Sequence, residues 1–308
     1  MRDPLNDLGT GTYKGHLGGL YPGGVSTMPN THRAAGMIIH QRVQPRDSAG
    51  RIDSVNGKIV LLSIGMSNCN YEYAVFKPLA DADPLKSPYV IVVNGALPTN
   101  NAGVISKDTA SYWNHVDSEL RRAGVTRAQV QAVWLKNAHA SVTAGFPEHA
   151  DSLSRDFQSI VRIIKNRMRF VSVTYLTSRS YAGYATAPLS PEPIAYETGF
   201  AFRWLIERQL NGDTTLRFTG SQAPAPFLAW GPYLWADGMN PRSDGLTWSI
   251  DDFVESDRTH TSDQGRLKVA QMLLDFFHTD PLARQWYRRP TPSSANDEWS
   301  VPLELDLQ

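Results

Sequence analysis

Two short segments that lie far apart in the 308-residue chain contain side chains able to perform nucleophilic chemistry together. The first segment holds Ser67, just after an apolar run that ends in Gly65. The second holds Asp257 and, three residues later, His260. A carboxylate at this spacing can accept a hydrogen bond from one imidazole nitrogen, which leaves the other nitrogen to take a proton from a serine hydroxyl. The three residues therefore predict a serine nucleophile with a histidine base and an orienting aspartate.

Each segment taken alone has a simpler interpretation. Ser67 stands where the helix after the apolar run should begin, so capping of that helix is an alternative role for its hydroxyl. An aspartate and a histidine three residues apart are also common in ordinary surface loops. At a helix start, however, the backbone N–H of Ser67 has no partner within the helix, and it can stabilise a negatively charged oxygen during acyl transfer. The pairing of the two segments favours the chemical interpretation.

The elements that must position these residues follow from the hydrophobic pattern. From residue 58 onward, apolar runs of strand length alternate with segments of helical period. Continuous apolar strands separated by helices are typical of a parallel sheet covered on both faces, so the pattern predicts an α/β domain. Active sites of such folds lie beyond the carboxyl ends of the strands, where Ser67 is expected. The expected strands are 59–64, 89–94, 130–135, 169–176 and 227–231, and the expected helices are 107–123, 150–167, 194–210 and 262–278.

The chain is expected to divide into three parts. Residues 1–56 are rich in Gly, Pro, Asn and Thr and predict an irregular arm packed on the core. Residues 57–280 form the predicted catalytic domain, and residues 281–308 form a C-terminal tail. Within the domain, the segment 212–256 is dense in Gly, Pro and Trp and is expected to be a long surface connection.

Together, the two chemical segments resemble the blocks of the SGNH (GDSL-type) hydrolase family. Its first block carries the serine after a glycine on the first strand, and its last block is an Asp-x-x-His before the C-terminal helix. The run from Gly65 to Asn68 is similar to the Gly-Gln-Ser-Asn of the family's carbohydrate acetylesterases. The resemblance spans roughly residues 58–278 and implies a three-layer, flavodoxin-like α/β/α sandwich with a five-stranded, mainly parallel sheet. It also implies serine-dependent hydrolysis of short acyl esters, with an O-acetylated carbohydrate as the first candidate substrate.

The resemblance further implies an oxyanion hole made by Ser67, Gly95 and Asn137. The family uses a glycine and an asparagine, each in a loop after a strand, and Gly95 and Asn137 occupy the matching positions. The chain departs from the usual pattern beside the triad and beside the asparagine, which puts Asn137 in more doubt than Ser67 or His260. The departures are Met66, Leu135, Ala138 and Thr261, and the alternative donors are Asn94, Asn100 and Asn101.

Two further segments at strand ends contain candidate substrate-binding residues. Arg179 and Tyr181 lie in the segment 178–184, and Trp235 lies in the segment 230–248. Their aromatic rings suit stacking on a sugar, and Arg179 suits an anionic group of the substrate. The alternatives are packing of the tryptophan onto the core and an ion pair of Arg179 with Glu192 or Glu197.

Composition excludes several function classes. Thirty basic and thirty acidic residues give a formal net charge of zero, so no whole-molecule field favours nucleic acid. The single cysteine, Cys69, rules out an internal disulfide and a cysteine-based zinc site. The histidines show no metal-ligand spacing, and the chemistry requires no cofactor. No apolar run suits membrane insertion or a signal peptide, so a soluble protein is expected, although export with a cleaved signal would leave the same pattern.

The expected partner is a small-molecule or glycan ester, while the compartment and the oligomeric state are not predicted. Two other functions on the same scaffold stay open. One is a carbohydrate-binding protein without catalytic activity, because a fold does not guarantee an activity. The other is a hydrolase of lipids or thioesters, which would differ only in the shape of the pocket.

Overall fold

The computed structural model describes residues 2–289, and its centre is a sheet of five parallel strands. Every neighbouring pair in the sheet is parallel, as the apolar runs predict. The first strand of this sheet along the chain, β3, therefore has neighbours on both sides. The next strand, β4, lies on one side of β3, and the three later strands follow on the other side. In spatial order the strands are β4 (Val90–Asn94), β3 (Ile59–Gly65), β5 (Val130–Lys136), β6 (Val173–Leu176) and β7 (Phe227–Trp230).

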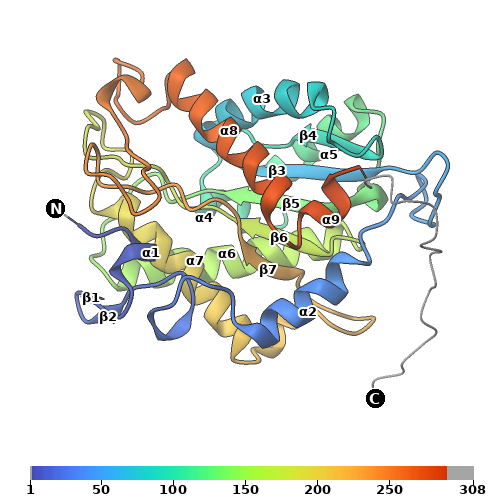
Figure 1. Cartoon of the computed structure of the whole chain (residues 1–308), viewed down its shortest axis with the longest axis horizontal. Coiled ribbons are helices and arrows are strands. Elements are labelled where there is room, and N and C mark those ends of the chain that lie inside the picture. Colours follow the sequence, from blue (N-terminus) through green and yellow to red (C-terminus); the bar gives the residue numbers. More distant parts are fainter. Residues whose placement is uncertain (1, 290–308) are drawn as a thin grey trace.

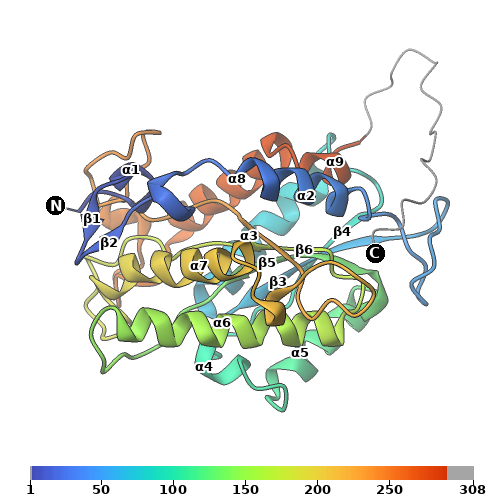
Figure 2. The same cartoon turned by 90° about the horizontal axis from the view of Figure 1, so that it is seen from below.

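Helices cover both faces of the sheet, which confirms the expected three-layer α/β/α arrangement (Figures 1 and 2). On one face α3 (Ser67–Ala82) packs against α8 (Asp263–Thr279), with α9 (Arg284–Tyr287) beside them. On the other face α6 (Glu148–Arg167) packs against α7 (Ile194–Leu210). This second face also carries α4 (Ala102–Ile105) and α5 (Tyr112–Arg122).

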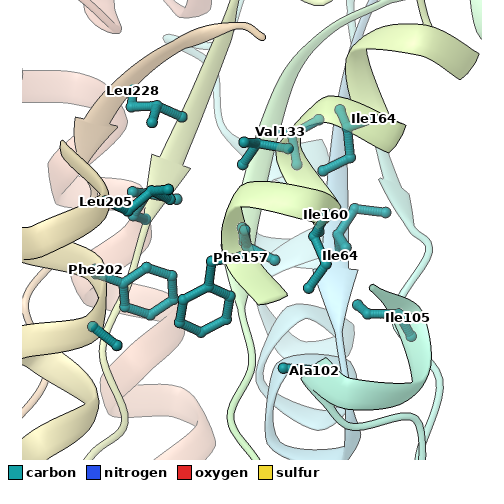
Figure 3. Close-up of a cluster of buried hydrophobic side chains, with 14 of the residues drawn as sticks. Ile64, Ala102, Ile105, Val133, Phe157, Ile160, Ile164, Phe202, Leu205 and Leu228 are labelled. Carbon is teal, nitrogen blue, oxygen red and sulfur yellow. The ribbon is translucent and has the colours of Figure 1, made fainter. Parts of the chain in front are cut away.

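The apolar side chains form one hydrophobic cluster on each face of the sheet. On the α6–α7 face, Phe157 and Phe202 stack with their ring centroids 4.0 Å apart and their planes within 8° of parallel (Figure 3). Ile160 and Leu205 extend this contact toward the sheet, where Val133 lies buried. Burial of apolar area of this kind holds helices to a sheet at about 25 cal/mol per Å².

Residues 1–56 contain a helix that the sequence did not predict. This is α2 (Asn30–His40), which lies along the edge strand β7. His32 stacks on Phe227 at 4.2 Å, and its Nε2 lies 2.8 Å from the Leu228 carbonyl oxygen. Gly36 weakens the helical signal in the sequence, but a Cβ there would approach the Phe227 ring to 2.8 Å. The helix therefore needs a poor helix former in order to pack closely. The arm also contains α1 (Leu5–Leu8), β1 (Thr12–Tyr13) and β2 (His16–Leu17).

Other differences from the expected elements are small. The strand expected at 169–176 begins only at Val173. The helix expected at 107–123 corresponds to α5, which begins only at Tyr112, and the short helix α4 before it was not expected. The segment 212–256 is not confined to the surface, because Trp235 and Trp248 have no exposed area. Within residues 2–289, no helix combines the length and the hydropathy needed to cross a membrane.

Candidate active site

The turn after β3 presents Ser67 at the carboxyl edge of the sheet. Gly65 ends the strand beside Lys136 of β5, and a Cβ on Gly65 would lie 2.1 Å from the Lys136 carbonyl oxygen. Only glycine fits this close approach. Met66 is the N-cap of α3 and has extended backbone, so Ser67 is the first helical residue. No side chain caps this helix end, which excludes the capping role for the Ser67 hydroxyl.

The Ser67 hydroxyl is instead hydrogen-bonded to His260. The Oγ lies 2.8 Å from Nε2 of the imidazole, and Nδ1 of the same ring lies 2.6 Å from Oδ2 of Asp257. The structure thus brings together the three residues that the two sequence segments predicted. The arrangement requires a proton on Nδ1, which Nδ1 donates to the Asp257 carboxylate, and a lone pair on Nε2 that accepts a hydrogen bond from the serine hydroxyl. About a fifth of each of the Asp257 and His260 side chains is exposed, so the group is open to solvent.

A tight turn before α8 holds Asp257 and His260 in place. The second carboxylate oxygen of Asp257 accepts hydrogen bonds from the backbone N–H groups of Thr259 and His260, at 2.8 and 2.9 Å. Arg258, between them, has φ 51°, in the left-handed region. Burial acts to raise the pKa of Asp257, but the hydrogen bonds from His260 and Thr259 outweigh it and place this pKa below the ordinary aspartate value. The carboxylate therefore stays ionised when it orients the imidazole.

Asn68 connects the serine turn to the histidine turn. Its Nδ2 donates a hydrogen bond of 3.1 Å to the backbone carbonyl of Thr259. Its Oδ1 is buried and has no hydrogen-bond partner in the part of the chain that the structure describes. The side chain comes from the second residue of α3, next to Ser67, and so fixes the distance between the two halves of the site.

Gly95 and Asn137 follow the two strands that flank β3, as the resemblance implies. The Gly95 N–H lies at the carboxyl edge of the sheet, one residue beyond the end of β4. Asn137 is buried, and its amide donates one hydrogen bond to the Asn100 carbonyl at 3.1 Å, which leaves its second N–H available. Ser67, the first residue of α3, adds a backbone N–H that has no acceptor within the helix. Three donors thus follow three adjacent strands.

The alternative asparagines are used elsewhere. Asn94 donates to the Asn70 carbonyl at 2.9 Å and accepts from the Ser63 hydroxyl at 2.8 Å, which ties the β4 loop to α3. Asn101 accepts a hydrogen bond from Gly103 and caps α4. Asn100 donates to the Pro98 carbonyl at 2.9 Å. Asn137 therefore stays the preferred candidate for the amide donor.

A buried ion pair holds the helix that begins with Ser67 against the sheet. The Lys136 ammonium lies 2.5 and 2.6 Å from the two carboxylate oxygens of Glu72, and both side chains are almost wholly excluded from solvent. Burial raises the pKa of the Glu72 carboxyl, and the Lys136 charge opposes this by stabilising the carboxylate. The pair joins α3 to β5, and Lys136 is the sheet partner of Gly65, two residues before Ser67.

Two of the three predicted substrate-binding residues are buried. Arg179 donates to the carbonyls of Leu189 and Ser190, and Trp235 is fully buried and donates from Nε1 to a Glu192 carboxylate oxygen at 2.7 Å. The expectation that Arg179 and Trp235 contact substrate therefore has no support in the structure, because their polar groups are satisfied inside the protein. The ion pair of Arg179 with Glu192 or Glu197 is absent from the described residues as well.

Tyr181 keeps its place as a candidate, because its side chain is only partly buried. It packs edge-on against Tyr184 with ring centroids 5.1 Å apart. The Thr186 N–H donates to the Asp257 carbonyl at 3.0 Å, so this segment adjoins the triad turn. The segment that carries Tyr181 and Tyr184 therefore lies at the same edge of the sheet as the triad turn.

Sequence reasoning missed Tyr71, which contacts the triad. Its ring meets that of His260 edge-on at 5.7 Å, and the Arg266 guanidinium lies over it at 5.0 Å from the centroid. Its spacing of four residues from Ser67 puts it on the same face of α3, and this was the available signal. No group of three or more His, Cys, Asp or Glu suited to a metal ion occurs within residues 2–289.

Comparisons with known proteins give fold-level similarity only. No family model matches the chain, and no curated protein matches it. Among solved structures, a Bacillus subtilis protein shares 11% identity over 74% of this chain and 58% of its own, with a TM-score of 0.38. A salicylyl-acyltransferase from a tetracycline biosynthetic pathway shares 15% identity over 75% of this chain and 58% of its own, with a TM-score of 0.37. The chain thus spans less than two thirds of the length of these two proteins.

A further similar structure is a carbohydrate esterase of family 3 from Talaromyces cellulolyticus. It shares 13% identity over 70% of this chain and 93% of its own, with a TM-score of 0.36. Identities and TM-scores of this size do not transfer an activity from one protein to another. The function must therefore be argued from the residues of the site itself.

Proposed function

We propose that the protein is a serine esterase that acts through an acyl-enzyme intermediate. The observation that carries the proposal is the continuous hydrogen-bonded chain from Ser67 through His260 to Asp257, with contacts of 2.8 and 2.6 Å. A helix cap or a surface loop would not require this alignment of hydroxyl, imidazole and carboxylate. Alignment of a nucleophile with a base that is itself oriented by a third group is what activates an alcohol near neutral pH.

The first half-reaction transfers the acyl group to the enzyme. Nε2 of His260 takes the proton of Ser67 as Oγ attacks the ester carbonyl, and Asp257 stabilises the imidazolium that forms. The negative charge on the carbonyl oxygen is stabilised by the N–H groups of Ser67 and Gly95 and by the amide of Asn137, and loss of one such donor typically costs ~100- to 1000-fold in turnover. His260 then gives its proton to the leaving alcohol. A water molecule repeats these steps on the acyl-enzyme and releases the acid.

The proposed substrates are short acyl esters, with an O-acetylated carbohydrate tested first. The similarity of the Gly65–Asn68 run to carbohydrate acetylesterases supports this choice. So do the partly exposed ring of Tyr71, which contacts His260, and the partly exposed rings of Tyr181 and Tyr184 in the segment that adjoins the triad turn, since aromatic rings can stack on a sugar ring.

The proposal is tested with p-nitrophenyl acetate. Ser67→Ala and His260→Ala should each lose at least roughly 1000-fold in kcat/KM, because residues of a triad act as a unit. Ser118→Ala, which removes a partly exposed serine of α5, should turn over like the wild type. A fluorophosphonate should label the wild type and the Ser118 variant and leave the Ser67 variant unlabelled. Undiminished turnover by the Ser67 variant would remove the proposal.

Assays with other ligands and substrates separate the alternative functions. Affinity for an acetylated oligosaccharide without labelling of Ser67 would identify a carbohydrate-binding protein. Faster hydrolysis of p-nitrophenyl octanoate or of a thioester than of a fully acetylated monosaccharide would identify a lipid or thioester hydrolase. Acetate release from the sugar should be the fastest of the three if the proposed substrate class is right.

A further inference from the structure

A cavity of about 620 Å³ lies at the edge of the sheet opposite the triad. It is formed by the end of α6 and by the connection between α7 and β7, both of which precede the amino ends of strands (Figure 2). The volume lies within the range of about 300–1,000 Å³ that is usual for small-molecule sites. Hydroxyl and amide groups, three cationic groups (those of Arg162, Lys165 and Arg169) and the carboxylate of Asp108 line it.

A second, smaller cavity of about 140 Å³ continues this surface. It shares Lys165 and Arg169 with the first cavity and adds Arg42 and Arg46. The guanidinium groups of Arg46 and Arg169 both lie over the Phe170 ring, 4.2 and 4.4 Å from its centroid. The ring fixes their positions and leaves the Arg169 N–H groups free of side-chain or backbone acceptors within residues 2–289. We call Arg42, Arg46, Arg162, Lys165 and Arg169 the basic cluster.

The positive charge of the basic cluster is not balanced by the protein. None of its five members forms an ion pair with a carboxylate in the described part of the chain. The one carboxylate that lines the cavities, Asp108, is already paired with Arg167, whose Nε lies 2.6 Å from its Oδ1. Asp213 is close enough to Arg162 for a weak attraction, but Thr215 occupies its Oδ1 with two hydrogen bonds.

Crowding of like charges in a partly buried place is unfavourable unless an opposite charge joins them. Burial and the charge of Arg42 lower the pKa of Lys165 to about 8. Burial and the charge of Arg169 lower the pKa of Arg46. In a protein whose formal charges sum to zero, this concentration of unpaired cations marks one place where an anion would lower the energy of the folded state.

We propose that the basic cluster binds a small ligand that carries at least two phosphate- or sulfate-type groups. Arg162 and Arg169 are its main ligands, because their side chains are exposed and have no acceptor among residues 2–289. A guanidinium offers paired N–H donors that match two oxygens of such a group, and the free N–H of the Lys165 ammonium adds a third contact. The other two protons of Lys165 go to the carbonyls of Arg169 and Val171, at 2.9 and 2.7 Å. The site lies away from Ser67 and does not depend on ester hydrolysis.

The test is calorimetric titration of the full chain with inorganic pyrophosphate at low ionic strength. The double variant Arg162→Ala, Arg169→Ala should bind at least roughly tenfold more weakly, since charge-assisted contacts are lost. Arg162→Lys with Arg169→Lys keeps the charge and should bind between these limits. The matched control is Arg121→Ala with Arg122→Ala in the last turn of α5 and should bind like the wild type. Thermal unfolding checks that each variant is folded.

Two results would overturn the proposal. One is absence of pyrophosphate binding by the wild-type protein. The other is equal weakening in the α5 control, which would mean a non-specific response to net charge. Added salt can weaken pyrophosphate binding by screening charge or by competing for the site. Sulfate and chloride at matched ionic strength separate these two effects, because both salts screen equally and sulfate should compete more strongly for the arginines.

Discussion

The side-chain amide of Asn68 donates a hydrogen bond to the backbone carbonyl of Thr259, the residue before His260. This contact joins the helix that begins with Ser67 to the turn that carries the imidazole. It therefore controls how the base meets the nucleophile, although Asn68 itself takes no part in proton transfer. It is a positioning residue for the proposed reaction.

Asn68→Ala should lower kcat roughly 10- to 100-fold and leave KM nearly unchanged, because a small displacement of a reacting group is costly while substrate contacts are kept. The rate of fluorophosphonate labelling at Ser67 should fall in parallel. Asn114→Ala, at an exposed position of α5, provides the control. A rise in KM with unchanged kcat would show that Asn68 binds substrate and does not position the base.

Asp257→Asn should lower kcat roughly 100- to 10,000-fold. The amide cannot stabilise the imidazolium, and its N–H₂ group facing Nδ1 favours the wrong tautomer of His260. The hydrogen bonds that Oδ1 accepts from Thr259 and His260 can persist, so the turn should stay folded. Steady-state kinetics and thermal unfolding of the same preparation measure the two effects separately. A loss of less than tenfold would mean that the carboxylate does not orient the base.

Removing one partner of the Glu72–Lys136 pair should lower the free energy of unfolding more than replacing both residues. Lys136→Met leaves the Glu72 carboxylate buried without its partner, and the free energy of unfolding should fall by about 3–5 kcal/mol. The double variant Glu72→Leu, Lys136→Met removes both charges and should recover most of this loss. Urea unfolding of the three proteins gives the coupling energy. A double variant as unstable as the single one would contradict the prediction.

The protein should lose stability in acid through His40. This buried ring contacts the Gly36 carbonyl at 2.7 Å and the Tyr175 hydroxyl at 2.8 Å, and burial lowers its pKa to about 4 from the ordinary 6.5. Between these two values the unfolded chain binds a proton that the folded protein does not, so stability falls as the pH decreases from 6.5 to 4. The difference of about 2.5 units in pKa sets an upper limit of about 3 kcal/mol.

His40→Gln removes this titration. Urea unfolding at pH 7, 5.5 and 4 should therefore show a gap between variant and wild type that shifts in favour of the variant as the pH falls. A constant gap across the three pH values would mean that the pKa of His40 is the same in the folded and the unfolded protein.

The parts of the fold that sequence could predict are those set by local pattern. Five apolar runs gave five strands within a few residues of their observed bounds, because burial on both faces leaves a continuous signal. Ser67 and the Asp257–His260 turn could be found because glycine, serine and the Asp-x-x-His spacing are themselves local. Helix α2 was missed because Gly36 is chosen by its contact with Phe227, which sequence does not display.

The supporting residues of the site could not be predicted for the same reason. Glu72 and Lys136 are 64 positions apart in the chain and meet only when α3 lies on β5. Trp235 has the residue type of a sugar-binding platform, yet its surroundings bury it against Tyr196, with ring centroids 4.6 Å apart. Residue type is a local property, whereas exposure belongs to the assembled fold.

Ser67 and His260 are separated by 193 positions, and this separation determines when during folding the site can form. During synthesis, the serine is an unremarkable alcohol until the last long helix has docked beside the helix that it begins. Any reactivity of this hydroxyl is thus created by folding and lost on unfolding. Covalent labelling of Ser67 would consequently report, molecule by molecule, how much of the polypeptide has reached its native state.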